Sequence, residues 1–303
     1  MFDKKIIHYP YDILGSVAIV KFPMKMKASE KKKFGVRLLN ENNSLKTVLE
    51  KVGKFSGRLR KMQTNFISGE NTKDVLYREN GCIFRFNVDS TYFSPRLSNE
   101  RREIASLIKN GDEVFVMFAG VSPFSICIGK NSQAKKVYSN EINREANKYG
   151  ELNIQLNKLK GKVILVPGDV KRVAKKISGF RSLPLPPPTQ TPAQLKSIRS
   201  SYSQKFSPTQ IAFGAEIPKK FDVIVMPRPQ LKDSFLKEAF LLSKKGTRIY
   251  YYDFGTEEEK KIILEKIHSE AKKAKKKIKI LKIKKAGEVA PYRFRIRVDF
   301  KVL

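Results

Sequence analysis

The sequence predicts an α/β fold in which a doubly wound sheet follows a smaller α+β region. Four short segments carry this prediction, because each is rich in β-branched or aromatic residues and ends in a glycine, an acid or a proline. They span residues 114–118, 136–143, 163–170 and 221–229. Segments with helical character follow the first two, and strands that alternate with helices form parallel sheets. We therefore expect the carboxyl ends of these strands to lie together, at the edge where such sheets bind ligands.

The strand ends carry residue types that suit a nucleotide site. Residues 119–123 form a small-residue turn after the first strand, and Gly120 there allows backbone to approach a bound nucleotide. Glu141 ends the second strand, where an acid accepts hydrogen bonds from ribose hydroxyls. Asp169 ends the third strand, and Met226 precedes a proline-stiffened loop after the fourth. Because the turn has one glycine instead of the spaced set of a dinucleotide fingerprint, each strand end alone also fits ordinary α/β architecture.

Residues 1–88 are predicted to form the α+β region. A strand pair turns at Gly15, residues 31–38 favour a short helix, and residues 46–52 fit either a strand or a short helix. The loop over residues 52–61 combines glycines with basic side chains, which is typical of a phosphate-contacting loop. Its candidate RNA-binding residues are Arg58, Arg60 and Lys61. A solvated hairpin turn is the alternative interpretation.

A strand and an amphipathic helix link this region to the doubly wound sheet. Residues 81–96 alternate apolar and polar side chains and turn at Pro95. The helix is predicted over residues 97–109, with Ser98 as its amino-terminal cap.

The carboxy-terminal part closes with a helix and a strand pair. The helix is predicted over residues 257–277, and the strands over residues 277–285 and 293–302. Between the third and fourth strands, a proline-rich insertion spans about residues 182–215. It is either an arm over the ligand edge or a tolerated surface insertion.

The composition indicates a polyanionic partner. The chain of 303 residues has 62 Lys and Arg against 29 Asp and Glu, a formal charge of +33. Thermal adaptation usually raises Glu together with Lys, and here the acids lag far behind. Cys82 and Cys127 lie in apolar runs and are expected to be buried free thiols in a reducing compartment. Since no apolar stretch reaches membrane-spanning length and the amino terminus lacks a signal-peptide core, we expect a soluble, cytoplasmic monomer.

Five motifs together resemble one enzyme family. They are YFSPRLSNER (92–101), MFAGVSPFSI (117–126), VYSNEIN (137–143), GDV (168–170) and DVIVMPRP (222–229). In this order they are similar to the archaeal and eukaryotic tRNA (guanine-N1)-methyltransferases, class I enzymes with a Rossmann-like fold. The likeness covers nearly the whole chain from Tyr11.

The resemblance implies a reaction, a cofactor and a partner. These enzymes methylate N1 of the guanosine at position 37, beside the anticodon, with S-adenosylmethionine as cofactor and the tRNA anticodon stem-loop as partner. The expected architecture is an RNA-recognition domain over residues 1–88 and a methyltransferase domain over residues 89–303 with an antiparallel last strand. Some members have a further small amino-terminal domain, and this chain begins too late to contain it, so we expect its contacts with the tRNA elbow to be missing.

The resemblance also implies roles for individual residues. On the cofactor side, the turn contacts the methionine part through its backbone, Glu141 the ribose and Asp169 the adenine amino group. The cofactor-binding set is Phe118, Ala119, Gly120, Val121, Glu141, Ile142, Asp169, Val170 and Met226. On the substrate side, Arg96 reaches the target base, where a cation stabilises the charge that builds on O6 as the N1 proton leaves. The catalytic set is Arg96, Pro227 and Pro229, with Glu141 as a possible base, and Arg96 and Arg228 join the RNA-binding residues.

Departures from the family pattern keep alternatives open. Val116 stands where members have an acid, Ser122 where they have a glycine, and residues 227–229 read Pro-Arg-Pro instead of Asn-Leu-Pro. The altered proline loop leaves room for a second substrate, the tricyclic wyosine precursor at the same tRNA position. The competing interpretations are an aminocarboxypropyl transferase that uses the same cofactor and a non-catalytic tRNA-binding protein. For Arg96 the alternative is an ion pair with Glu100 or Asp89.

Overall fold

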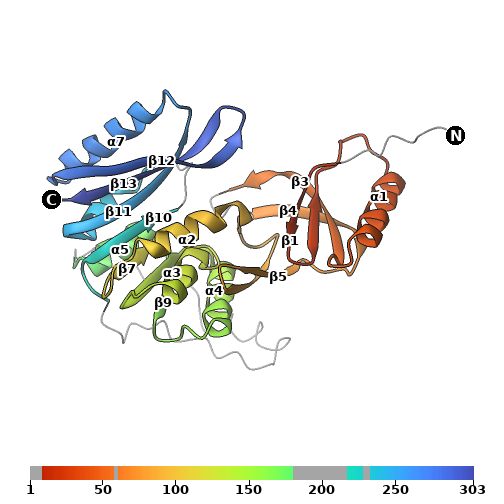
Figure 1. Cartoon of the computed structure of the whole chain (residues 1–303), viewed down its shortest axis with the longest axis horizontal. Helices are drawn as coiled ribbons and strands as arrows, with labels where there is room; N and C mark the ends of the chain where they lie inside the picture. The colour runs from red at the N-terminus through yellow and green to blue at the C-terminus, as the bar shows by residue number, and fades with distance from the viewer. Residues whose placement is uncertain (1–8, 58–60, 180–216, 228–232) are drawn as a thin grey trace, which may run out of the picture.

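The computed structural model describes residues 9–57, 61–179, 217–227 and 233–303. A seven-stranded sheet flanked by helices forms the larger part, and a four-stranded sheet with one helix forms the smaller part (Figure 1). Within the described ranges, no helix is both long and apolar enough to cross a membrane.

The larger sheet has the strand order β12–β13–β11–β10–β7–β8–β9. The strands from β11 to β9 are parallel, and β13 runs antiparallel to β11 and β12. The strands are β7 (Glu113–Val116), β8 (Lys136–Glu141), β9 (Val163–Pro167), β10 (Phe221–Met226), β11 (Ser243–Gly255), β12 (Ile278–Ala290) and β13 (Arg293–Val302). The predicted doubly wound sheet with an antiparallel last strand is confirmed. Strand β11 was not among the predicted elements.

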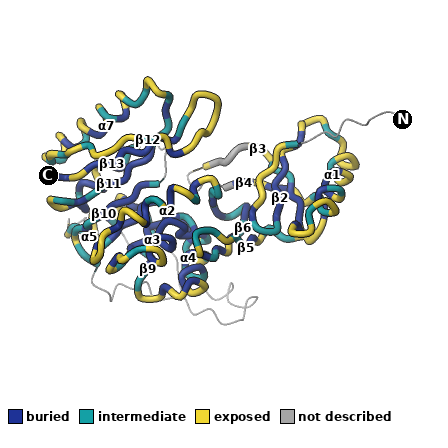
Figure 2. Tube along the Cα trace, viewed as in Figure 1, coloured by how far each residue is buried: buried dark blue, intermediate teal, exposed yellow. Residues whose placement is uncertain are grey.

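Helices cover both faces of this sheet, which explains why its strands are apolar on both sides. In β7, Val114 and Val116 face one core with Ile126, whereas Phe115 faces the other core with Ile263. Figure 2 shows these central strands as largely buried. On the first face lie α2 (Ser98–Ser106), α3 (Pro123–Asn131) and α4 (Arg144–Leu156). On the second lie α5 (Val170–Ile177), α6 (Leu236–Leu241) and α7 (Lys260–Lys273).

The predicted cap of α2 is wrong. A 3₁₀ turn, η1 (Pro95–Leu97), leads directly into the helix, so the chain is already helical at Ser98, with φ −56° and ψ −47°. An N-cap needs a non-helical backbone, and that position is taken by Leu97. The Ser98 hydroxyl instead accepts a hydrogen bond from Asn80 Nδ2 at 3.2 Å.

The smaller part contains the strands predicted around Gly15, and residues 47–52, predicted as either a strand or a short helix, lie in a strand. Its sheet has the order β1–β2–β3–β4, and α1 (Ala28–Glu41) packs on it through Phe34 and Leu38. The strands are β1 (Tyr11–Leu14), β2 (Val17–Val20), β3 (Thr47–Ser56) and β4 (Lys61–Gly69).

A separate hairpin, β5 (Asp74–Glu79) and β6 (Cys82–Asn87), is fixed to α4 by two asparagines. The Asn153 amide accepts from Arg85 N at 2.6 Å and donates to Arg85 O at 3.0 Å. The Asn157 amide binds Ile83 in the same way, at 2.9 and 2.6 Å. Because two side-chain amides satisfy the backbone of β6, the hairpin and the larger sheet form one packed unit.

Candidate active site at the strand ends

The carboxyl ends of β7, β8, β9 and β10 meet at one edge of the larger sheet. The turn after β7 is tied to both of its neighbouring strands. Met117 N donates to Val225 O at 2.9 Å, and Ala119 N donates to Asn140 O at 2.8 Å. The predicted cofactor residues are therefore brought together at this edge.

Gly120 in this turn has two reasons to be glycine. Its φ of 58° lies in the left-handed region, and a Cβ added there would lie 3.3 Å from Tyr92 O. Ser122 also has a left-handed backbone, with φ 68°, although the family pattern has glycine there. Its buried hydroxyl lies 2.9 Å from Ser139 Oγ, and Gly150 leaves the space beside it. These contacts accommodate the serine in a conformation that glycine adopts without strain.

Glu141, at the end of β8, accepts hydrogen bonds from the backbone around it. Its Oε2 accepts a hydrogen bond from Gly120 N at 2.8 Å, and its Oε1 accepts from Ile142 N at 2.8 Å and Asn143 N at 2.7 Å. The residue is buried. Since a carboxylate offers about four acceptor positions, one on Oε2 remains for a ligand.

The segments that follow β9 and β10 lie at the same edge of the sheet. Asp169 caps α5 by accepting a hydrogen bond from Lys171 N at 2.9 Å. The rings of Phe118 and Phe235 meet edge to face with centroids 5.0 Å apart, and Lys171 Nζ lies 5.2 Å from the Phe235 ring. The segments after β7, β9 and β10 are thus in mutual contact.

The segment before η1 lies over the ends of β7 and β8. Ser90 O accepts a hydrogen bond from Asn143 Nδ2 at 2.9 Å, and Tyr92 O is the atom nearest to the open side of Gly120. This segment leads into η1 and brings Arg96 to the same end of the sheet.

Arg96 forms an exposed ion pair. Its Nη2 lies 2.9 Å from Asp12 Oδ1 of β1, and the two side chains are 68% and 56% exposed. The expected alternative, a pair with Glu100 or Asp89, is wrong, because other cations hold those two carboxylates. An exposed pair contributes about 0–1 kcal/mol, so Arg96 can leave Asp12 for a bound ligand at small cost.

Several predicted positions lie outside the described ranges. They are Arg58, Arg60, Arg228, Pro229 and the insertion over residues 182–215. Of the loop predicted over residues 52–61, residues 52–56 belong to β3 and Lys61 opens β4, so these described residues lie in strands. Met226 is buried at the end of β10, and Pro227 follows it directly.

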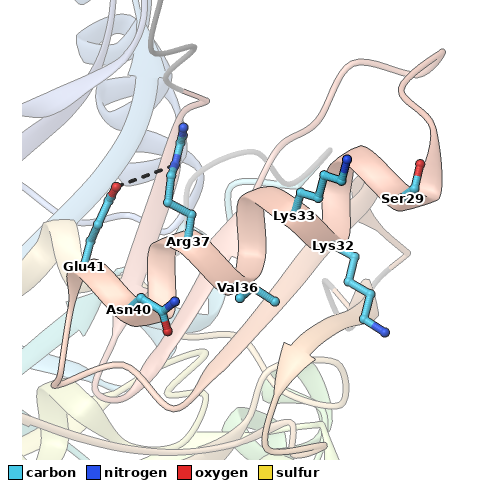
Figure 3. A pocket seen from close by; sticks show the side chains of 7 residues that line it. All are labelled: Ser29, Lys32, Lys33, Val36, Arg37, Asn40 and Glu41. Carbon is cyan, nitrogen blue, oxygen red and sulfur yellow. Dashed lines mark ion pairs between the residues drawn. The ribbon is translucent and has the colours of Figure 1, made fainter. Parts of the chain in front are cut away.

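A basic groove on α1 was missed by the sequence reasoning. The side chains that line it project from one face of the helix and border an open surface hollow of about 670 Å³ (Figure 3). They are Ser29, Lys32, Lys33, Val36, Arg37, Asn40 and Glu41. Spacings of three and four residues put them on one helix face, so the signal was present in the sequence. The groove belongs to the smaller part, away from the strand ends.

A buried ionic cluster beside the strand ends was also missed. Arg297 of β13 is fully buried and donates to Glu100 Oε2 at 2.8 Å, Glu103 Oε1 at 2.7 Å and Asp299 Oδ1 at 2.7 Å. The strand register places Arg297 opposite Tyr252, at the level where β10 ends. Nearly 200 residues separate Glu100 from Arg297, so no local pattern could have revealed the pair.

The charges in this cluster set the protonation of its members. Burial raises the pKa of Glu103, but hydrogen bonds from Lys284 and Arg297 outweigh it and lower the pKa to about 2. The stabilisation from Glu103 is therefore complete above its ordinary value of 4.5 and is lost as the pH falls through 2. Burial, with the Glu100 carboxylate, raises the pKa of the Tyr252 hydroxyl well above its usual range.

Both cysteines are buried free thiols, as predicted. Cys82 of β6 and Cys127 of α3 flank Asn131, whose Nδ2 lies 3.8 and 3.5 Å from the two sulfur atoms.

Similarity to known proteins extends over the whole chain. A family described as the TRM5/TYW2 methyltransferase domain matches residues 75–186. The tRNA (guanine(37)-N(1))-methyltransferase Trm5b of Pyrococcus abyssi is 30% identical over 300 residues, which are 99% of this chain and 76% of the relative. The tRNA (guanine(37)-N(1))/4-demethylwyosine(37)-methyltransferase Taw22 of Nanoarchaeum equitans is 29% identical over 309 residues, 97% of this chain and 99% of the relative.

Solved structures agree with this relationship. The crystal structure of Trm5b from Pyrococcus abyssi superposes with a TM-score of 0.74 at 30% identity and covers 99% of this chain and 79% of that one. The complex of aTrm5 with tRNALeu gives a TM-score of 0.73 at 26% identity, with 98% and 73% of the two chains covered. The chain belongs to the TRM5/TYW2 family of methyltransferases.

Proposed function

We propose that this protein transfers a methyl group from S-adenosylmethionine to N1 of the guanosine at position 37 of tRNA. The observation that carries the proposal is the convergence of the Gly120 turn, Glu141 and Asp169 at one sheet edge. Similarity over 99% of this chain to two tRNA (guanine(37)-N(1))-methyltransferases supports it.

The residues at this edge fit S-adenosylmethionine. Gly120 adds no side chain to the turn, Glu141 retains an acceptor position for a ribose hydroxyl, and Asp169, which caps α5, is proposed to accept a hydrogen bond from the adenine amino group. When bound, the cofactor supplies an electrophilic methyl group on a sulfonium. The residues proposed to hold it are Phe118, Ala119, Gly120, Val121, Glu141, Ile142, Asp169, Val170 and Met226.

On the substrate side, Arg96 is proposed to stabilise the target base. Guanine N1 must lose a proton, and the negative charge that then builds on O6 is stabilised by a guanidinium donor. Pro227 and Pro229 are proposed to frame the base pocket, and Arg228 to contact the RNA. Glu141 already accepts three backbone hydrogen bonds, so we propose that it binds the ribose of the cofactor and does not act as the general base.

The Glu141→Gln variant separates these two roles. An amide turns one acceptor into a donor that faces backbone N–H groups, so we expect the Kd for S-adenosylmethionine to rise about 10- to 100-fold. Isothermal titration measures this change, and Glu145→Gln, at an exposed acid in the first turn of α4, should leave the Kd unaltered. A normal Kd with a low kcat at saturating cofactor would instead make Glu141 the base.

The basic groove of α1 is proposed to bind the tRNA backbone. Reversing two charges with Lys32→Glu and Lys33→Glu should weaken tRNA binding. The slope of log K against log salt concentration should also become shallower, by roughly one unit for each phosphate that is no longer neutralised. The matched control reverses two exposed charges on α7, Lys272→Glu and Lys273→Glu. An equal weakening in both double variants would show that net charge matters and the groove does not.

A second substrate is suggested by one relative. Taw22 of Nanoarchaeum equitans, which aligns over 99% of its own length, is named for guanosine and 4-demethylwyosine. We propose that the Pro-Arg-Pro segment of this chain also admits the tricyclic base, and transfer to tRNA that carries it tests this. An aminocarboxypropyl product would identify the alternative transferase by its larger mass.

Transfer of a labelled methyl group to unmodified tRNA tests the main proposal. The expected result is one methyl per tRNA, and none on a transcript with adenosine at position 37. Equal labelling of both transcripts would contradict it, and failure to bind the cofactor would favour the non-catalytic alternative.

A further inference from the structure

We propose that the tip of the β12–β13 hairpin, residues 287–293, holds an unpaired nucleotide of the substrate RNA by stacking it on Tyr292. This contact would be additional to the methyl-transfer site and rests on the function proposed above. Position, backbone conformation and exposure each point to it.

The hairpin tip lies beyond the edge where the parallel strands end. Met226 at the end of β10 pairs with Tyr251, whereas β13 continues to pair with β11 as far as Phe294 and Gly255. That is four residues further, about 13 Å at roughly 3.3 Å per residue. In Figure 1 the turn of this hairpin lies at the end of the larger sheet that faces the smaller part. Strand β12 also lies beside η1, which carries Arg96, so the hairpin that bears the tip contacts the segment of the proposed base site.

Tyr292 has a backbone conformation that is unusual for tyrosine. Ala290 pairs with Arg293, which leaves Pro291 and Tyr292 as a two-residue turn, and the φ of Tyr292 is 60°. A turn with proline first and a positive φ second ordinarily has glycine or asparagine at the second position. A tyrosine in that conformation indicates a use for its side chain that the turn itself does not need.

The chemistry of the tip favours a base over a phosphate. Tyr292 is 82% exposed, more than any other aromatic residue in the described part of the chain. Arg293 beside it offers a cation, while the exposed carboxylate of Glu288 disfavours a phosphate. Aromatic rings and guanidinium planes stack on bases that are free of a duplex, as in a tRNA anticodon loop.

An ion-pair contact with α2 holds the stem of the hairpin, and this fixes the position of the tip relative to the larger sheet. Lys284 Nζ lies 2.7 Å from Oε1 of the buried Glu100 of α2 and also pairs with Glu103. An aromatic side chain on a fixed support loses little entropy when it binds.

A fluorescence titration tests the stacking directly. The chain has no tryptophan, so Tyr292→Trp places a single reporter at the tip. We expect an unmodified anticodon stem-loop to quench it, and a blunt duplex RNA with the same number of phosphates to leave it unchanged. Leu281→Trp, in β12 of the same hairpin and 51% exposed, should respond to neither RNA. No quenching, or equal quenching by the duplex, would overturn the inference.

The Tyr292→Gly variant provides the kinetic test. Glycine suits the turn at least as well as tyrosine, so the fold should be retained. We expect the KM for tRNA to rise roughly tenfold, which corresponds to the loss of one base–aromatic stacking contact, while the Kd for the cofactor stays unchanged. The Tyr292→Phe variant keeps the ring and should have the wild-type KM. An unchanged KM in an active enzyme would overturn the inference and leave the proposed function standing. A wild-type protein that transfers no methyl group, although the stem-loop quenches the Tyr292→Trp reporter, would overturn the proposed function alone.

Discussion

Replacing Arg96 with alanine is expected to lower kcat for methyl transfer about 100-fold and to leave the Kd for S-adenosylmethionine unchanged. The guanidinium acts on charge that develops on guanine O6 only as the N1 proton leaves, and one such donor contributes about 10²–10³ in rate. Single-turnover transfer to unmodified tRNA at saturating cofactor measures the effect.

The control for Arg96 removes the same charge from a neighbouring position. Arg102 of α2 is exposed and close in sequence, so Arg102→Ala should retain the wild-type rate. Stability should change by less than about 1 kcal/mol in either variant, because the Arg96–Asp12 pair is solvent-exposed. A full rate in Arg96→Ala would remove this residue from the mechanism.

The Arg297→Met variant is expected to lose about 3–5 kcal/mol of unfolding free energy. It removes the cation from a buried cluster and leaves Asp299 and the Glu100 side chain in an apolar environment with too few partners. Urea denaturation followed by circular dichroism measures the loss, which is large compared with the effect of a surface substitution.

A compensated variant checks the cause of that loss. Adding Asp299→Asn and Glu100→Gln to Arg297→Met removes two of the stranded charges, so part of the stability should return. A loss below about 1 kcal/mol in Arg297→Met alone would contradict the account of the cluster.

The sequence predicted the sheet edge well because its signals are local. Three of the four predicted strands are mainly apolar runs and β8 is more polar, and a glycine or an acid stands at or just after three of the strand ends, as at Gly120, Glu141 and Asp169. Parallel strands bring such ends together whatever the loops between them do. Strand β11 was missed because α6 ends at Leu241 and β11 begins at Ser243, so no turn residues separate them.

The remaining features depend on contacts between distant segments. The ion pair of Arg96 with Asp12 spans 84 positions, whereas the alternative partners Glu100 and Asp89 are those that lie near Arg96 in the sequence. Likewise, the sequence placed the β5–β6 hairpin in the first 88 residues. In the structure it packs on α4, through amide contacts that span 68 and 74 positions. Periodicity and turn chemistry carry no information about such pairings.

Mass spectrometry of anticodon-loop fragments is the direct test of methyl transfer to N1 of guanosine 37. Unmodified tRNA is incubated with the protein and S-adenosylmethionine and then digested into defined fragments. We expect a gain of one methyl group on the nucleoside at position 37, with the fragmentation pattern and chromatographic retention of 1-methylguanosine. A methyl group at any other nucleotide, or no gain while the cofactor is bound, would contradict it.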